Sequence, residues 1–356
     1  MTGGPQDTTV SATAWVATRL GAPSEALETR TVEVGLPGAN QVRVSTEAFC
    51  LDFNDIDTIR GRYGLLKLEP PFVPGMVAAG TVDAVGPGAE ALTGRRVVGV
   101  TAGVQGGYAS SALLDAATVQ TLPNRLSCVD GVAMYFPYLV GWLALRERGR
   151  IRPGDLLLVH AGAGGMGSGV IQLAKAFGAT VIATAGTDEK VEFCRLLGAD
   201  HAVNYRDRDF VGFVDDVTNG RGVDLAFDTV GGQVTLDTFR TMAFNGRHLI
   251  VGYSADITLE EQGVNLQPSI YGNFDLVGIC FAFVDDPRLT RCLGMNFLSR
   301  ADGIRIWDGI LQLHQQGAVR PVVGRELRFD EVPPMLEAIE ERRTMGRTVV
   351  RVAPQE

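Results

Sequence analysis

The residues whose chemistry is clearest form a glycine-rich segment at 156–173, LLLVHAGAGGMGSGVIQL. An apolar run leads straight into the pattern Gly-x-Gly-x-x-Gly, and a helical pattern follows at once. A dinucleotide-binding loop needs this context, because its glycines permit a tight turn, let the backbone approach a pyrophosphate and let the helix pack on the strand. The N–H groups that begin the helix then face the phosphates. The alternative is a structural glycine loop without a ligand. The predicted contacts are Gly162, Gly164, Gly165, Met166 and Gly167.

The end of the next predicted strand favours NADP over NAD. A chain that binds NAD carries Asp or Glu about 20 residues beyond the glycines, where the carboxylate bonds the ribose hydroxyls. Here the strand ends at Ala185-Gly186, and the acidic residues Asp188 and Glu189 come later, in the first turn of a helix. Lys190 can reach back to a 2′-phosphate, or it can be an ordinary solvated surface lysine. The sequence therefore predicts NADPH as the cofactor.

Short apolar runs that alternate with helical patterns must position these residues. Each run is nearly continuously apolar, as is typical of strands buried on both faces. Helices of this length between them form βαβ units, so we predict an α/β Rossmann domain with a doubly wound parallel sheet. The predicted strands are 156–160, 180–185, 201–205, 223–228, 248–252 and 276–283.

The chain before this region has a different pattern. Residues 13–127 contain short β-rich runs broken by Gly and Pro, for example at 41–45, 80–85 and 96–100. Such runs predict a compact, mostly β domain. A last strand at 348–352 is expected to rejoin this domain.

Length, charge and cysteine use exclude several classes of protein. The 356 residues suit two domains, and the net charge of −9 argues against a nucleic-acid partner. The longest uncharged apolar run, 132–145, is too short to span a bilayer and contains Pro137, so it predicts a buried helix rather than a membrane segment. The first 13 residues lack the features of a secretory signal, and no cysteine pair has CxxC spacing, which together favour free thiols in the cytoplasm. The cysteines are Cys50, Cys128, Cys194, Cys280 and Cys292.

Six segments in a fixed order carry a family resemblance: CLDFNDIDTIRGRYG (50–64), PFVPGMVAAGTVDAVG (71–86), VHAGAGGMG (159–167), LGADHAVNY (197–205), FDTVGG (227–232) and RRTMGRTVV (342–350). Together they resemble the medium-chain dehydrogenase/reductase superfamily and, within it, the zinc-free quinone oxidoreductase group. The resemblance covers nearly the whole chain. It implies a GroES-like, mostly β catalytic domain from residues 1–128 and 286–356, with a Rossmann NADPH-binding domain at 129–285.

The resemblance also implies contacts by matching position. A lysine at Lys190, a tyrosine at Tyr205 and an arginine at Arg342 hold the 2′-phosphate in relatives. Relatives are commonly homodimers through the strand at 276–283, which is a long apolar run at the expected sheet edge, and an open edge invites pairing. The further predicted cofactor contacts are Gly186, Gly252 and Tyr253.

Several departures from zinc-dependent relatives matter for the chemistry. Where those relatives carry zinc ligands, this chain reads Leu-Asp-Phe at 51–53 and Gly-Met-Val at 75–77, and residues 89–115 hold no cysteine. We therefore expect no metal. Three positions are unusual even among zinc-free relatives and suggest an atypical substrate: Asp52 where Asn is common, Val77 where Glu is common and Val140 where Thr is common.

The expected reaction is hydride transfer between NADPH and a small molecule, in which the cofactor carries the chemistry and the protein supplies orientation and electrostatics. A quinone acceptor is the leading interpretation, and an enoyl thioester or enone is the second. A protein that binds NADPH without turnover is a third, since a fold does not determine a function. Tyr63 is the candidate proton donor, because related 2-enoyl thioester reductases place a tyrosine in the same Gly-x-Tyr segment; otherwise it lines the cleft. Asp52 is the second candidate catalytic residue.

Overall fold

The computed structural model describes residues 8–64, 67–261, 263, 265–286, 288–291 and 294–352. The described residues divide into two compact units. The first unit draws on Met1–Tyr135, Ala282–Arg305 and Val323–Glu356, and the second on Phe136–Phe281 and Ile306–Val322. Residues 306–322, expected in the catalytic domain, belong to the second unit, and residues 129–135, expected in the Rossmann domain, belong to the first.

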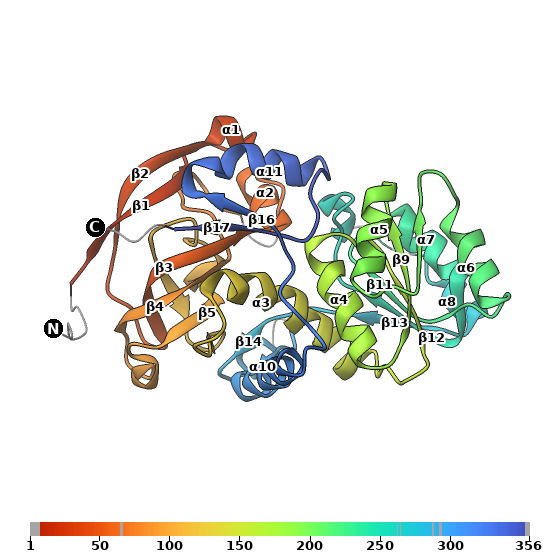
Figure 1. The fold of residues 1–356 in the computed structure, drawn as a ribbon. Helices are drawn as coiled ribbons and strands as arrows, with labels where there is room; N and C mark the ends of the chain where they lie inside the picture. Colours follow the sequence, from red (N-terminus) through yellow and green to blue (C-terminus); the bar gives the residue numbers. More distant parts are fainter. Residues whose placement is uncertain are drawn as a thin grey trace. The chain divides into compact units, whose positions relative to one another are not determined.

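The second unit is built on a six-stranded sheet whose neighbouring strands are all parallel. Its order is β10-β9-β8-β11-β12-β13 (Figure 1), which in chain order is the 3-2-1-4-5-6 of a Rossmann fold. The predicted doubly wound α/β sheet is therefore confirmed. The strands are β8 (Leu156–Val159), β9 (Thr180–Ala185), β10 (His201–Asn204), β11 (Val223–Asp228), β12 (Met242–Ile250) and β13 (Asp275–Gly278).

Helices connect successive strands of this sheet and cover both of its faces (Figure 1). Thr187 caps the start of α5 by accepting from the Lys190 N–H at 3.3 Å, and Gly198 follows the helix end with φ +106°. Phe210 and Val214 of α6 pack against the buried side chains of the sheet. The helices are α4 (Gly165–Ala176), α5 (Asp188–Leu196), α6 (Phe210–Thr218), α7 (Gln233–Thr238) and α8 (Gln267–Gly272), with the short helices η4 (Phe239–Thr241) and η5 (Ile257–Glu261).

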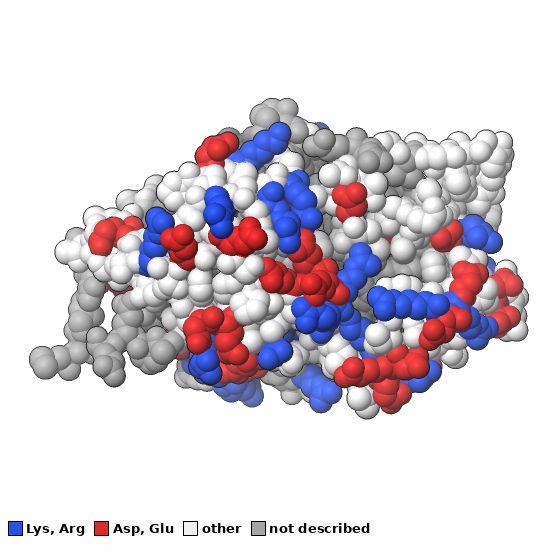
Figure 2. All heavy atoms as spheres, turned by 90° about the horizontal axis from the view of Figure 1, so that it is seen from above, with Lys and Arg blue, Asp and Glu red and all other residues white. Residues whose placement is uncertain are grey.

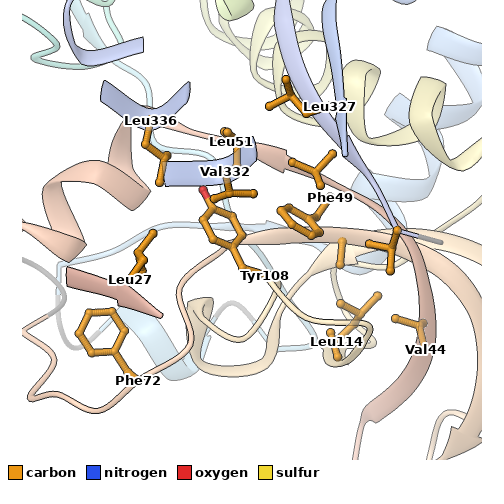
Figure 3. Close-up of a cluster of buried hydrophobic side chains, with 14 of the residues drawn as sticks. Leu27, Val44, Phe49, Leu51, Phe72, Tyr108, Leu114, Leu327, Val332 and Leu336 are labelled. Atoms are coloured by element: carbon orange, nitrogen blue, oxygen red, sulfur yellow. The ribbon is translucent and has the colours of Figure 1, made fainter. Parts of the chain in front are cut away.

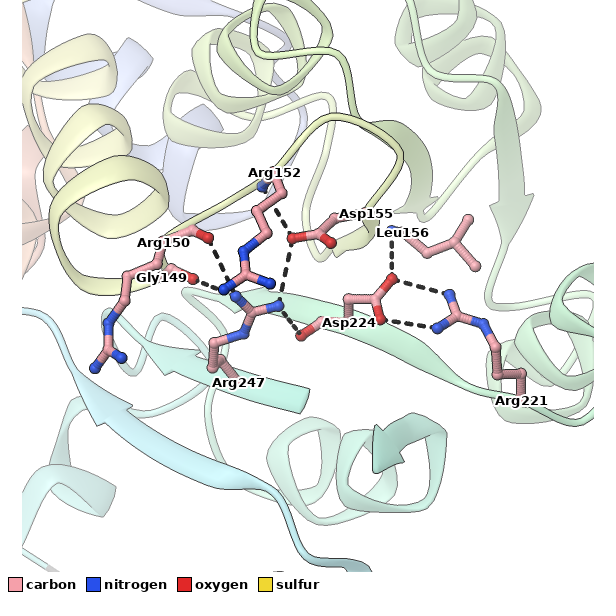
Figure 4. A network of polar contacts seen from close by, with 8 residues as sticks. All are labelled: Gly149, Arg150, Arg152, Asp155, Leu156, Arg221, Asp224 and Arg247. Carbon is pink, nitrogen blue, oxygen red and sulfur yellow. Dashed lines mark hydrogen bonds and ion pairs between the residues drawn. The ribbon is translucent and has the colours of Figure 1, made fainter. Parts of the chain in front are cut away.

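A network of arginine contacts ties the amino ends of three central strands together (Figure 4). Arg247 of β12 donates to the Gly149 carbonyl at 2.8 Å and to Asp155 Oδ2 at 3.3 Å. Asp224 of β11 accepts from the Leu156 N–H of β8 at 2.8 Å and from both Nη atoms of Arg221. These contacts stabilise the edge of the sheet opposite the glycine loop.

The first unit is organised around a seven-stranded sheet of order β16-β17-β3-β4-β5-β7, with β6 paired to β3. Its pairs are antiparallel except β16–β17, and β17 pairs with β3, so the predicted return of the chain end to the first domain is confirmed. The strands are β3 (Gln41–Leu51), β4 (Val77–Val85), β5 (Arg96–Val100), β6 (Ser111–Asp115), β7 (Gln120–Thr121), β16 (Val323–Arg328) and β17 (Arg347–Arg351).

Smaller elements surround this sheet. A two-stranded antiparallel sheet joins β1 to β2, and a two-stranded parallel sheet joins β14 to β15. The elements are β1 (Val10–Ala17), α1 (Pro23–Ala26), β2 (Leu27–Val34), α2 (Phe53–Ile59), η1 (Glu90–Leu92), η2 (Ala102–Val104), β14 (Phe283–Val284), α9 (Arg288–Arg291), β15 (Leu298–Ser299), η6 (Phe329–Glu331) and α11 (Val332–Glu340), and α10 (Arg300–Gln315) crosses the unit boundary.

The core of the first unit lies where α11 meets the sheet (Figure 3). Val332 and Leu336 of α11 are fully buried beside Phe49 of β3. The Phe49 ring stacks on Tyr108 at a centroid distance of 4.8 Å. Burial of such apolar side chains is worth roughly 1.5–3 kcal/mol each, so this contact fixes α11 on the sheet.

Two expectations about apolar runs have different outcomes. The run at 132–145 lies in α3 (Cys128–Trp142), which contains Pro137 and continues into the π-helical turn Leu143–Arg148. By length and composition Cys128–Arg148 could cross a membrane, but 83% of its most apolar window is buried in the protein, as in a core helix. The run at 276–283 is not one long strand: β13 ends at Gly278, and Phe283 belongs to another sheet.

Candidate functional site

The glycine loop lies between β8 and α4, where the order of the parallel sheet reverses. In doubly wound sheets ligands bind outside the carboxyl ends of the strands at this switch point. Gly162 N–H donates to the Thr184 carbonyl of β9 at 3.0 Å, and Gly164 N–H donates to the Ala161 carbonyl at 2.9 Å. The left-handed residue of the turn is Ala161, with φ +51°.

The glycines of the loop are required by close packing. A Cβ at Gly167 would lie 2.4 Å from the Ala161 carbonyl oxygen and 2.7 Å from Gly162 Cα. A Cβ at Gly162 would lie 3.0 Å from Cys194 Sγ. A Cβ at Gly164 would meet only the Ala161 oxygen, at 3.2 Å, so Gly164 keeps one side of the loop open.

The start of α4 completes a cradle for phosphate. The helix begins at Gly165 with Gly164 as its N-cap residue, and no side chain of the described residues caps it. Its first N–H groups can therefore donate to an anion, which the helix dipole also favours. Met166 is half-buried in the same turn. The residues present fit the pyrophosphate of a dinucleotide.

A buried histidine supports this loop from beneath. His160 Nε2 lies 2.8 Å from Thr238 Oγ1, and Nδ1 lies 3.1 Å from Thr184 Oγ1. Since the Thr238 hydroxyl donates to the Val234 carbonyl at 2.6 Å, it must accept from His160, which places the ring proton on Nε2. Burial lowers the pKa of His160 to about 4, so the ring is neutral at pH 7.

Asp228 organises the loop that follows β11. Its Oδ1 accepts from the Val230 N–H at 2.8 Å and the Gly231 N–H at 3.1 Å. Its Oδ2 accepts from Thr235 Oγ1 at 2.5 Å and lies 3.3 Å from His248 Nε2. Burial acts to raise the pKa of Asp228, but the hydrogen bond from His248 and the other donors hold it well below its usual range. The carboxylate therefore stays ionised and fixes the loop.

The predicted contacts Gly252 and Tyr253 lie beside this loop. Val251 N–H donates to the Asp228 carbonyl at 2.8 Å, which brings the segment after β12 against the segment after β11. A Cβ at Gly231 would lie 2.6 Å from Tyr253 Cδ1, so the ring packs on the glycine backbone. Both segments follow the carboxyl ends of strands of the same sheet as the glycine loop.

Three of the residues predicted to bind the 2′-phosphate or to lie beside it come together at the end of β9. Tyr205 N–H donates to the Ala185 carbonyl at 3.0 Å, and a Cβ at Gly186 would lie 2.9 Å from the Tyr205 hydroxyl oxygen. Lys190 is half-buried in the first turn of α5 beside this point. Asp188 accepts from Asn204 Nδ2 at 3.1 Å, so its carboxylate is engaged with β10.

Asp52 lies in a buried ion pair of the first unit. Arg347 of β17 donates to both of its oxygens, at 2.6 and 3.0 Å, and also to Cys50 Sγ at 2.7 Å. Burial acts to raise the pKa of Asp52, but the Arg347 charge lowers it below its usual range. A carboxylate that is ionised and bonded on both oxygens is not a free proton donor or base, so the structure does not support Asp52 as a catalytic residue.

A second carboxyl group lies behind this pair. Asp55 Oδ2 accepts from the Tyr108 hydroxyl at 2.7 Å and from the Asp52 N–H at 2.9 Å. Burial, and then the negative charge of Asp52, raise the pKa of Asp55 to about 7. Burial also raises the pKa values of Cys50 and Tyr108 well above their usual ranges, so both stay protonated at neutral pH. Sequence reasoning missed this cluster, although charged residues beside apolar strands signal buried partners.

Replacing Asp55 with Asn should change how stability depends on pH. Because the folded pKa of Asp55 is raised from 3.8 to about 7, its neutral form contributes stability that is present below pH 4 and lost as the pH rises through 7. Asp55→Asn should remove this loss and gain on the order of 1–3 kcal/mol over wild type between pH 5 and 8. Urea unfolding across that range measures it. The exposed Asp215→Asn serves as the control substitution, and parallel curves for Asp55→Asn and wild type would contradict the prediction.

The remaining predicted residues are placed as follows. Tyr63 is half-buried in the loop that follows α2, and Arg342 is exposed in the turn after α11 with φ +59°, both in the first unit. Val77 of β4 and Val140 of α3 are buried side chains, with 0% and 7% exposure. The structure thus brings Gly186, Lys190 and Tyr205 together within the second unit, whereas Arg342 belongs to the first.

Three further observations concern parts of the protein outside this site. Within the described ranges no group of three or more His, Cys, Asp or Glu side chains could hold a metal ion. A recess of about 360 Å³ lined by Gly222, Arg240 and Met242 lies at the amino end of β11, away from the glycine loop. Acidic and basic side chains are intermixed on the face that Figure 2 shows.

Comparisons with known proteins agree with this architecture. Residues 38–124 match the alcohol dehydrogenase GroES-like domain, and residues 165–291 match the zinc-binding dehydrogenase family. Quinone oxidoreductase-like protein 2 of Rattus norvegicus is 30% identical over 88% of this chain and 85% of its own length. The chain belongs to the medium-chain dehydrogenase/reductase superfamily, in its quinone oxidoreductase-like group.

Two other members of the superfamily bear on chemistry. The 2-haloacrylate reductase of a Burkholderia species is 38% identical over 59% of this chain, and the match spans 65% of that protein, which is less than two thirds. The Escherichia coli quinone oxidoreductase solved in complex with NADPH has 25% identity and a TM-score of 0.82, covering 96% of this chain and all of that one. The medium-chain fold and its subgroup, expected from the six sequence segments, are thereby confirmed.

Proposed function

We propose that this protein is an NADPH-dependent reductase that transfers a hydride to a quinone-like small molecule. The observation that carries the proposal is the glycine cradle at the carboxyl end of β8, in which a Cβ at Gly167 would lie 2.4 Å from a backbone oxygen. The E. coli relative that was solved with NADPH supports the cofactor, and the names of the quinone oxidoreductase relatives support the acceptor class.

The protein's own residues bind and orient in this proposal. When bound, NADPH supplies the hydride. Gly164 and the first N–H groups of α4 hold the pyrophosphate, while Lys190, Tyr205 and Arg342 hold the 2′-phosphate. The neutral His160 and the ionised Asp228 keep the surrounding loops in place without exchanging protons.

A panel of acceptors tests the proposal directly. NADPH oxidation is followed with a series of quinones, enones and acrylates, and turnover with quinones is the expected result. Turnover with activated double bonds alone would favour a double-bond reductase over the proposed quinone reductase. Tight NADPH binding without turnover on any acceptor would favour a binding protein without catalysis.

Reduction of an activated carbon–carbon double bond is the second candidate. It is favoured by the 38% identity to a 2-haloacrylate reductase, whose named substrate carries such a bond. Negative charge then gathers on the carbonyl or carboxylate oxygen of the substrate, and a placed donor becomes useful. Tyr63 is the residue we assign to that role in this case.

Replacing Tyr63 with Phe should separate the two reductase activities. General acid catalysis by one side chain contributes about 10²–10⁴-fold, so a double-bond reductase should lose turnover by that factor. A quinone reductase should lose only a few-fold, because the reduced quinone takes protons from water, and this small effect is what we expect. The kcat on the best acceptor is the measurement, with Tyr271→Phe of the exposed α8 as the control. A large loss of NADPH affinity in Tyr63→Phe would contradict both versions.

Replacing Lys190 with Ala should weaken NADPH selectively. A charge-assisted contact to the 2′-phosphate is worth roughly 1.5–3 kcal/mol, or about 10- to 150-fold in Kd. NADH lacks that phosphate and should bind as before. Titration of both cofactors measures the ratio, and Arg195→Ala on the same helix, where Arg195 pairs with Glu192 on the surface, should change neither. Equal weakening of NADPH and NADH would show that Lys190 does not read the phosphate.

We extend the proposal to metal content, assembly and location. The zinc-ligand positions at 51–53 and 75–77 hold other residues, so purified protein should contain well under one zinc per chain. Exposed apolar side chains of Ile270 and Tyr271 on α8 precede the edge strand β13, which supports a homodimer that sedimentation would detect. Cys50, Cys128 and Cys194 are buried thiols, which supports a cytoplasmic location; Cys292 lies outside the described residues.

A further inference from the structure

Two sets of ion pairs in the first unit hold the same two chain segments together. One segment runs from Asp52 through α2 to Tyr63, and the other is the turn at 341–346, which carries Arg342 between α11 and β17. The buried pair of Asp52 with Arg347 joins one end of each segment. Glu340, the last residue of α11, joins the other ends.

Glu340 makes this second connection with both of its carboxylate oxygens. Its Oε2 lies 2.5 Å from Arg60 Nη2, and its Oε1 lies 2.9 Å from Arg62 Nη2. Arg62 Nε also donates to Asp57 Oδ1 at 3.0 Å, and the Asp57 side chain is only 3% exposed. Burial acts to raise the pKa of Glu340, but the bonds from Arg60 and Arg62 hold it below its usual range, so the carboxylate is charged at neutral pH.

Arg62 and Glu340 lie close in the chain to Tyr63 and Arg342, the two residues of this unit that the proposed function uses. Tyr63 directly follows Arg62, whose own N–H donates to the Asp57 carbonyl at 2.8 Å. Arg342 comes two residues after Glu340, and its N–H donates to the Ile339 carbonyl at 2.9 Å. Loss of the Glu340 carboxylate would therefore remove the ion pairs that tie the Tyr63 loop to the end of α11, from which the Arg342 turn begins.

The geometry points to Glu340 as a positioning residue that holds the Tyr63 loop and the Arg342 turn in one arrangement, so that recognition of the 2′-phosphate and of the acceptor depends on one carboxylate. This inference rests on the proposed function, from which Tyr63 and Arg342 take their roles. Glu340 acts through its two arginine partners, in the half-buried setting where its side chain is 21% exposed. Neighbouring charges that form a network hold their geometry better than an isolated surface pair does.

Glu340→Gln tests the inference, because it keeps the size of the side chain and removes its charge. The Kd for NADPH should rise roughly 3- to 10-fold and the Kd for NADH less than about 2-fold, and the KM of the acceptor should rise while kcat stays within about 2-fold. The matched control is Glu337→Gln, one turn earlier in α11, where Glu337 accepts from Ser24 Oγ at 2.5 Å. The control should leave both Kd values and the KM unchanged.

A second mutant background distinguishes a positioning role of Glu340 from a general weakening of cofactor binding. In Arg342→Ala, adding Glu340→Gln should no longer raise the Kd for NADPH, and Arg62→Gln alone should reproduce the Glu340→Gln pattern from the other side of the ion pair. Equal effects on NADPH and NADH, or a full NADPH effect that persists without Arg342, would overturn the inference. Fluorescence titration of NADPH requires no turnover. A wild type that binds NADPH and reduces no acceptor would refute the proposed function. The difference between the Kd changes for NADPH and NADH would still test the role of Glu340.

Discussion

Replacing Arg347 with Met should lower the free energy of unfolding by roughly 3–5 kcal/mol, because it leaves the largely buried Asp52 carboxylate without its cationic partner. Cys50 loses a donor in the same step, since Arg347 Nη2 lies 2.7 Å from its sulfur. Urea unfolding at neutral pH is the measurement. The effect is among the largest expected for a single substitution in this chain, because the Asp52 side chain is only 13% exposed and its remaining charge is poorly solvated.

Arg351 supplies the matched control for this substitution. It lies on the same strand, β17, and pairs with Glu326, but the side chain is 59% exposed. Arg351→Met should therefore cost less than about 1 kcal/mol. Pairing Arg347→Met with Asp52→Asn should recover part of the loss, since the unpaired charge is then removed. Similar small losses for Arg347→Met and Arg351→Met would mean that the buried pair contributes nothing to stability.

Replacing Gly167 with Ala should raise the Kd for NADPH by on the order of 100-fold and lower stability by roughly 1–3 kcal/mol. The new Cβ would lie 2.4 Å from the Ala161 carbonyl oxygen and 2.7 Å from Gly162 Cα. Both are backbone atoms, so α4 and the loop must move apart, and the N–H groups that receive the pyrophosphate move with them. Fluorescence titration and urea unfolding measure the two effects.

Substitutions at two other glycines distinguish the effect of close packing from the effect of contact with the cofactor. Gly212 is the third residue of α6, as Gly167 is of α4, but a Cβ there meets nothing closer than 3.5 Å, so Gly212→Ala should leave NADPH binding unchanged and raise stability by up to about 1 kcal/mol. Gly164→Ala meets only one oxygen at 3.2 Å and should weaken NADPH while leaving stability near wild type. If Gly167→Ala bound NADPH normally, the loop would not be the phosphate site.

Local sequence determined the second unit well. Continuous apolar runs and the Gly-x-Gly-x-x-Gly pattern predicted β8, the loop and α4, because a strand buried on both faces and a glycine turn are specified by residues close together in the chain. The cap at Thr187 and the glycine after α5 are local features of the same kind. The left-handed conformation of Ala161 in the same turn was not evident from the glycine pattern.

Tertiary structure alone decided what the charged and polar residues do. Asp52 pairs with Arg347 across 295 residues, and Tyr108 donates to Asp55 across 53, so no local pattern could reveal either partner. That burial and pairing turned Asp52 from a candidate catalytic residue into half of an ion pair. The ion pairs of Glu340 likewise depend on tertiary structure, because they join Arg60 and Arg62 to a helix that lies near the end of the chain. Period and propensity act over a few residues, whereas the energy of a buried charge depends on every group that the fold brings around it.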